Sequence, residues 1–159
     1  MITEVETGYI AGYLDGEGTI ALFKMLDEHR SQGYELIPVV KFCNTHQESL
    51  EWIKAKLNLD GKICPRPHYD GRKQSFELST SKREKVIEIL ELLGPHLIIK
   101  KQQAKLLLEF CKQRGNKPTT KERRDNGTFI SFKVACFDDK EIEIFNSLKQ
   151  LNHRGCRTL

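Results

Sequence analysis

Hydrophobic positions along the chain follow two periods, one typical of helices and one typical of strands. Apolar residues recur every third or fourth position through 45–57 and 81–93, which predicts two amphipathic helices. Period-two alternation between turn-rich segments predicts strands. The predicted strands pair into two hairpins: 19–26 with 34–43, and 62–66 with 74–80.

Capping signals set the expected helix boundaries. Thr45 with Glu48 and Ser81 with Glu84 have the spacing of a capping box, which predicts two helix starts. Gly61 is expected to end the first of these helices. The pair Gly94-Pro95 is expected to end the second helix and to begin another that runs over 95–113.

This order of elements predicts an α+β fold with one antiparallel four-stranded sheet and helices on one face. We expect a single domain over 1–159, with a core of about 5–113 and a C-terminal helical extension of about 114–159. Residues 114–125 are polar and basic and are expected to form an exposed loop, whereas 129–137 is apolar enough to pack. Asp138 is expected to cap a last helix.

A run of small residues precedes the first predicted strand. Gly8, Gly12 and Gly16 recur every fourth position beside Ala11, so on a helix they form a bare stripe that another backbone can approach closely. Glycine weakens a helix by roughly 1 kcal/mol relative to alanine, so a contact with a second helix would offset that cost. The alternative is a loose helix end followed by a glycine-rich turn.

Two carboxylates flank the last glycine of the stripe and point about 200° apart on a helix. Asp15 falls on the side of the glycines, where it can accept hydrogen bonds at a helix contact. Glu17 lies between Gly16 and Gly18 where the helix should stop, and a carboxylate at such a reversal suits Mg²⁺, which prefers oxygen ligands. The alternative is that Glu17 is a solvated turn residue.

Residues 10–18 resemble the signature segment of the LAGLIDADG homing endonucleases, a helix with small residues on one side that ends in acid-Gly-acid-Gly. The resemblance extends over roughly 5–110 and implies an αββαββα fold. It also implies that Glu17 and the Gly16 carbonyl hold Mg²⁺, for which Mn²⁺ is a possible substitute. The chain contains one such segment, so the resemblance implies a homodimer. The implied contact between the two chains consists of Gly8, Ala11, Gly12, Asp15 and Gly16.

The resemblance also assigns catalytic positions outside this segment. Lys100 matches a family lysine that reaches the cleavage site, and Gln103 matches a nearby glutamine. Positive charge there suits phosphodiester hydrolysis, which concentrates negative charge on the phosphoryl oxygens. His46 matches a position that holds water near the scissile phosphate, although it can equally be a helix cap. Leu50 departs from the family, which often has a basic residue there.

Strand parity predicts which side chains face double-stranded DNA. Two-stranded ribbons fit the major groove, where base edges are distinguishable. Val40, Phe42 and Leu78 should face the core, which leaves the alternate positions outward. The expected DNA-binding residues are Lys41, Arg66, His68, Arg72, Lys73, Ser75 and Glu77. The alternative for each of them is a solvated sheet face.

The first predicted strand is apolar on both faces. If Ala21, Phe23 and Met25 face DNA, they can contact thymine methyl groups; otherwise the strand is buried on both sides.

Composition permits this interpretation without requiring it. The 159 residues carry a formal net charge of +4 and have a pI near 8.8, which is mildly basic. The five cysteines are scattered and show no CxxC spacing, so neither a zinc site nor a disulfide framework is expected. Without a long apolar run or a signal segment, we expect a soluble protein of the cytoplasm or an organelle, neither secreted nor membrane-bound.

The resemblance thus implies a homodimeric, sequence-specific, metal-dependent DNA endonuclease that cuts both strands of a long pseudo-palindromic target. Two alternatives use the same fold: a maturase that binds RNA and assists intron splicing, and a DNA-binding regulator without catalytic activity.

Overall fold

The computed structural model describes residues 2–28, 32–67, 70–115, 119–123, 129–134 and 136–153, with the backbone alone for 119–123 and 129–134. None of the helices in these ranges has both the length and the apolar character needed to cross a membrane. The elements are α1 (Glu4–Glu17), β1 (Gly18–Leu26), β2 (Tyr34–Asn44), α2 (Gln47–Lys56), β3 (Ile63–Pro65), β4 (Phe76–Thr80), α3 (Arg83–Leu93), the 3₁₀ turn η1 (Gly94–His96), α4 (Lys101–Gly115), β5 (Thr119–Arg123), β6 (Phe129–Val134) and α5 (Asp139–Leu151).

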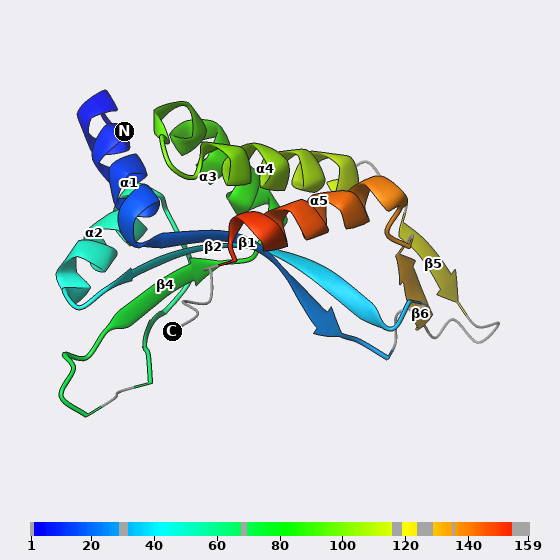
Figure 1. Cartoon of the computed structure of the whole chain (residues 1–159). Helices are drawn as coiled ribbons and strands as arrows, with labels where there is room; N and C mark the ends of the chain where they lie inside the picture. The colour runs from blue at the N-terminus through cyan, green and yellow to red at the C-terminus, as the bar shows by residue number, and fades with distance from the viewer. Residues whose placement is uncertain are drawn as a thin grey trace, which may run out of the picture.

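Strands β1 to β4 form one antiparallel sheet in the order β1-β2-β4-β3. The helices lie on one side of this sheet, and α5 packs on α4 and β1 (Figure 1). Within the described ranges no helix covers the opposite side, which we call the open face (Figure 1). The predicted α+β class and the αββαββα order are therefore confirmed.

The core lies between the helices and the sheet face that the alternation predicts. Val40, Phe42 and Leu78 have no exposed surface and belong to one apolar cluster with Ile10 and Leu14 of α1. Because side chains alternate along a strand, the residues between them point to the open face. The sheet therefore separates a buried apolar side from a side that is free to meet a ligand.

Helix α1 begins with a capping box that the sequence contains but that the predictions omit. The Thr3 hydroxyl accepts the Glu6 N–H at 3.2 Å, and the Glu6 carboxylate accepts the Thr3 N–H at 2.9 Å. This exchange satisfies two of the backbone donors exposed at the helix start. The capping box fixes where α1 begins and helps to stabilise a helix that its glycines weaken.

The start and end of α2 differ from the predicted ones. Its N-cap is His46, so the capping box of Thr45 is wrong. The helix ends before Gly61, because Leu57 caps it and Asn58 adopts a left-handed backbone with φ of 48°. Gly61 is needed for a different reason, because a Cβ there would lie 2.7 Å from the Ser79 carbonyl oxygen of β4.

Two further boundaries were predicted incorrectly. Helix α3 has Lys82 as its N-cap without a side-chain bond, so the capping box of Ser81 is wrong. The helix expected over 95–113 begins only at Lys101, after η1 and an extended Leu97. Residues 97–100 instead bring their backbone N–H groups toward α1, as described below.

The C-terminal part contains a hairpin as well as the expected helix. Strands β5 and β6 pair within the region predicted as a loop over 114–125 and the apolar segment after it. The capping box of α5 confirms the role of Asp138, whose carboxylate accepts the Glu141 N–H at 2.9 Å.

Buried Glu141 lies 3.6 Å from the Arg114 guanidinium, which stacks 4.2 Å from the Phe137 ring centroid. These contacts join α5 to the end of α4.

Replacement of Gly61 by alanine tests the close approach of the chain to β4. The new methyl group would overlap the Ser79 carbonyl, so we expect Gly61→Ala to lower the free energy of unfolding by roughly 1–3 kcal/mol. Gly94→Ala is the matched control, because its Cβ would meet nothing within 4 Å and its backbone is right-handed. Equal urea midpoints for the two variants would contradict this account.

Candidate active site and nucleic-acid interface

The carboxylate of Glu17 stands at the exposed C-terminal end of α1. Among the described residues it makes no hydrogen bond or ion pair. The last turn of α1 contains no basic residue, and the helix dipole places partial negative charge at this end. The local electrostatics therefore favour a cation beside Glu17.

The two glycines that flank Glu17 have different roles. A Cβ on Gly18 would lie 2.7 Å from the Leu14 carbonyl oxygen, so the fold itself requires glycine where α1 turns into β1. A Cβ on Gly16 would meet nothing within 4 Å. The Gly16 carbonyl belongs to the last helical turn, whose carbonyls lack helical partners. It is therefore a suitable second oxygen ligand for a hard cation near Glu17.

Asp15 ties α1 to the segment that leads into α4. Its carboxylate accepts backbone N–H groups from Ile98 at 2.6 Å, Ile99 at 3.2 Å and Lys100 at 2.9 Å. Charge-assisted bonds of this kind are about twice as strong as neutral ones. The segment stays non-helical up to Lys100 because its N–H groups bind this carboxylate.

The same carboxylate has a shifted pKa. Burial raises the pKa of Asp15, but the N–H groups of Ile98, Lys100 and Ile99, with the nearby Lys100 charge, outweigh burial and hold that pKa below its usual value. Asp15 therefore stays ionised in the folded protein at neutral pH.

Lys100 reaches the same end of α1. Its ammonium group donates a hydrogen bond to the Asp15 backbone carbonyl, next to Gly16 and Glu17 in the chain. The fold thus brings together two residues that are far apart in sequence and that the resemblance names as catalytic. They form one corner that carries an exposed carboxylate and a held cation.

The predicted small-residue stripe divides between two sides of α1. Ala11 and Asp15 are buried within the protomer, at 0% and 8% exposure, which corrects their assignment to the contact between chains. Gly8, Gly12 and Gly16 are exposed, and a Cβ on any of them would meet nothing within 4 Å. The stripe on the outer side therefore consists of glycines alone.

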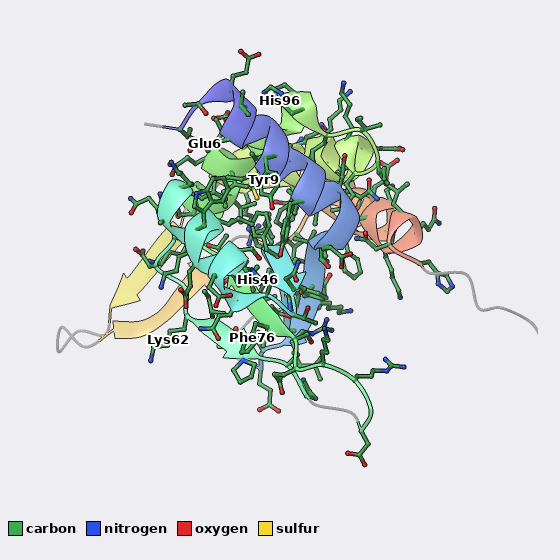
Figure 2. All side chains as sticks on the ribbon, turned by 90° about the vertical axis from the view of Figure 1, so that its left-hand side faces the viewer. Glu6, Tyr9, His46, Lys62, Phe76 and His96 are labelled. Carbon is green, nitrogen blue, oxygen red and sulfur yellow. The ribbon has the colours of Figure 1, made fainter. Side chains whose placement is uncertain are left out.

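Large apolar side chains lie beside this glycine stripe. Val5 is 84% exposed and Tyr9 is 56% exposed, and together with Trp52 they border a groove of about 400 Å³. Figure 2 looks onto this side of α1, with Tyr9 labelled. Ile98 and Ile99 are also exposed, near the other end of the helix. Sequence reasoning missed these residues, although the helical spacing of Val5 and Tyr9 around Gly8 is a usable signal.

The two remaining predicted catalytic residues differ in exposure: His46 is exposed at the start of α2, whereas Gln103 is buried on α4. The Nδ1 atom of His46 accepts the Ser49 N–H at 3.3 Å, and its Nε2 atom lies 3.2 Å from the Glu48 carboxylate. This is the capping role left open by the sequence, and a role in holding water stays a prediction. Gln103 is only 8% exposed and lies on the buried side of α4, so its catalytic role also stays a prediction.

Two of the predicted DNA-binding residues, Lys41 and Glu77, lie on the open face. Lys41 and Glu77 form an ion pair of 2.8 Å, and Lys41 lies opposite Ser79 in the strand register. Arg66, beyond the end of β3, donates its backbone N–H to the Ser75 carbonyl at 2.9 Å. Parity therefore places Lys41 and Glu77 on the open face, where the two side chains partly neutralise each other.

A polar pocket of about 290 Å³ connects the open face with the end of α1. It is lined by Glu17, Cys43, Asn44, Thr45, Arg66 and Ser75. Burial, and next the negative charge of Glu77, raise the pKa of the Cys43 thiol, which keeps it neutral. The pocket places a predicted base-reading arginine and the predicted metal ligand around one space.

The remaining predicted residues lie around the β3–β4 connection. Arg72 and Lys73 are exposed there, whereas His68 lies outside the described residues. Among the described residues, no three side chains of His, Cys, Asp or Glu gather as a metal site. A metal at Glu17 would therefore complete its coordination with oxygens other than these side chains, such as backbone carbonyls or waters.

No protein-family model and no curated protein matches the sequence. Solved structures do match it. I-CvuI in complex with its target and 2 mM Ca aligns at 20% identity over 98% of this chain and 87% of that chain, with a TM-score of 0.69. I-CvuI in complex with the I-CreI target and 2 mM Mg gives a TM-score of 0.68 at 20% identity, with the same coverage. The archaeal intron-encoded I-Vdi141I in complex with DNA aligns at 21% identity over 98% of this chain and 89% of that chain, with a TM-score of 0.69.

The chain has the fold of the LAGLIDADG homing endonucleases. The expected resemblance is thereby confirmed at the level of architecture. In this LAGLIDADG fold, the segment that suggested the family forms α1 and its turn into β1.

Asp15→Asn tests the tie between α1 and α4. Loss of the charged acceptor should lower the free energy of unfolding at pH 7 by about 1.5–3 kcal/mol. Because the pKa of Asp15 is depressed on folding, the stabilisation is present above its unfolded value near about 4 and is lost as pH falls through the folded value. Urea unfolding at neutral and at acid pH should therefore show a difference between wild type and variant that shrinks in acid.

The control for this test is Asp60→Asn. Asp60 forms an exposed ion pair with Lys82 at 2.7 Å, and such pairs contribute little to stability. A loss at pH 7 as large as that of Asp15→Asn would show that the three backbone bonds are not the cause.

Proposed function

We propose that this protein is a homodimeric, sequence-specific endonuclease that hydrolyses both strands of double-stranded DNA with a divalent cation. The observation that carries the proposal is the corner at the end of α1. There an exposed carboxylate that pairs with no described residue, a held lysine and an arginine-lined pocket adjoin the open sheet face, in a fold shared with homing endonucleases solved with DNA.

Glu17 and the Gly16 carbonyl would hold Mg²⁺, together with DNA phosphates. The bound ion supplies an activated water and stabilises the attacking and leaving oxygens. Mn²⁺ accepts similar oxygen ligands and is the expected substitute. The donor set fits a hard cation, since both groups are oxygens at the negative end of a helix dipole.

The protein's own groups orient and stabilise the DNA around that ion. The Lys100 ammonium, held at the Asp15 carbonyl, contributes positive charge where the scissile phosphate becomes more negative. Arg66 can form bidentate bonds to guanine from the pocket that also contains Glu17, so we assign it to base pairs near the cut. Lys41 can reach DNA after its pair with Glu77 opens or reorients.

Two copies of the chain would meet through the outer side of α1. The glycines there leave room for a backbone at close approach, and Val5, Tyr9, Ile98 and Ile99 supply apolar surface that is costly to leave in water. A two-fold contact through identical patches would bring the two Glu17 corners near one axis. Each corner would then serve one DNA strand of a pseudo-palindromic target.

Glu17→Gln tests the catalytic assignment. Target duplexes are first selected by cleavage from a randomised pool with Mg²⁺ present. The variant should bind a selected duplex normally and cut it at least about 100-fold more slowly, because it loses the charged metal ligand. The matched control is Glu143→Gln, an exposed carboxylate on α5, which should cut at the wild-type rate. Cleavage by Glu17→Gln at the wild-type rate would remove Glu17 from the mechanism.

Gly12→Leu tests the proposed dimer. A side chain at this position meets nothing in the described protomer, so the variant should fold normally but keep the two α1 helices apart. Sedimentation should show a dimer for wild type and a monomer for Gly12→Leu at the same concentration. The control Gly115→Leu carries the same change at the far end of α4 and should stay dimeric. An unchanged dimer in Gly12→Leu would rule out this interface.

A further inference from the structure

The open face of the sheet has two chemically different halves. Near the end of α1, its residues are polar or charged, as the Lys41–Glu77 pair and Ser79 illustrate. Farther along the β1–β2 ribbon, the outward positions of β1 are Phe23 and Met25. These two side chains are 44% and 55% exposed, which is a large exposed fraction for neighbouring apolar positions on one face of a strand.

The strand register extends the apolar surface from Phe23 to Ile37 of β2. Phe23 pairs with Ile37, whereas Met25 pairs with Glu35 at the outer limit of the patch, and the preceding outward pair, Ala21 with Val39, is buried. The patch therefore has a packed base and exposed side chains above it. Lys41 lies with its ammonium 5.5 Å from the Phe23 ring centroid, which places positive charge at the inner border of the patch.

This position limits what the patch can contact. It continues the face that carries the proposed base-reading residues, on a two-stranded ribbon of the width that fits a major groove. Thymine presents a C5-methyl group in that groove, whereas the other base edges present donors and acceptors. An exposed phenyl ring and thioether side chain match that methyl group and offer nothing to the polar edges.

We infer that Phe23 and Met25 are specificity-determining residues that contact thymine methyl groups in the outer part of each half-site. The inference rests on the proposed DNA endonuclease function. Phe23 is five residues beyond Gly18, or about 17 Å along the strand, which is the length of about five base pairs. Each half-site thus has an inner part read by polar groups and an outer part read by apolar contact.

The test replaces thymine by deoxyuracil, a change that removes only the methyl group. Duplexes are selected by cleavage as above, and their outer thymines are substituted one at a time. Binding is measured with Ca²⁺ present. Each contacted methyl group should be worth about fourfold in affinity, the value expected for one buried methyl-sized group. Uracil in the inner half-site, near the cut, should have a smaller effect.

Protein variants connect that effect to the two side chains. In Phe23→Ala/Met25→Ala the outer uracil penalty should disappear, because the partner of the methyl group is gone. Leu26→Ala is the matched control: it is an 88% exposed apolar residue of the same strand whose parity places it on the other face, and it should keep the full penalty. Unfolding midpoints check that each variant folds.

The outcomes separate this inference from the function on which it rests. If no duplex is bound or cut, the proposed function fails and the inference fails with it. If a selected duplex is bound and cut but outer uracil has no effect, or if the outer half-sites lack thymine, the inference alone is overturned. A uracil penalty that persists in Phe23→Ala/Met25→Ala assigns the contact to other residues and also overturns it.

Discussion

The position of the candidate site depends on one carboxylate that points inward. Asp15 binds three successive backbone N–H groups, and through them it fixes the start of α4 against the end of α1. Burial of a charge is unfavourable unless such bonds compensate it, so the two segments cannot separate without exposing N–H groups and leaving the carboxylate poorly satisfied. Lys100 and Glu17 come from distant parts of the sequence, and this interaction is what holds them at one corner.

The sheet supplies the second constraint. Side chains alternate between the two faces of the sheet with a period of two. Because one set is buried in the core, the other set must lie on the open face. Because β1 begins directly after Glu17, the open face starts at the corner formed by Glu17 and Lys100 and extends away from it. A ligand that lies along the ribbon would therefore meet the carboxylate at one end and the apolar patch of Phe23 and Met25 farther out.

Pattern reasoning predicted the features that depend on local periodicity. The four strands, the buried parity of Val40 and Phe42, and the Asp138 cap follow from alternation and capping chemistry, and the structure confirms them.

The helix start after Pro95 was mispredicted because a distant carboxylate competes for the N–H groups of the segment. The direction of Asp15 was missed for the same reason. Helical spacing shows on which side of α1 the carboxylate lies, but it does not show which groups bind it. Other differences also arise from contacts that are distant in sequence. Gly61 looks like a helix end, yet its lack of a side chain is needed for the approach to Ser79.

Glu17 pairs with no described residue, and its charge at the negative end of α1 is unfavourable in the isolated protomer. Its negative charge adds to the negative end of the α1 dipole, and the last turn offers no basic residue in compensation. Lys100 binds the neighbouring backbone carbonyl and so leaves the carboxylate oxygens available. A dimer through α1 would bring two such ends toward each other and increase their repulsion. Divalent cations and the Lys100 charges would relieve it, so the protomer contact, metal binding and DNA binding should favour one another.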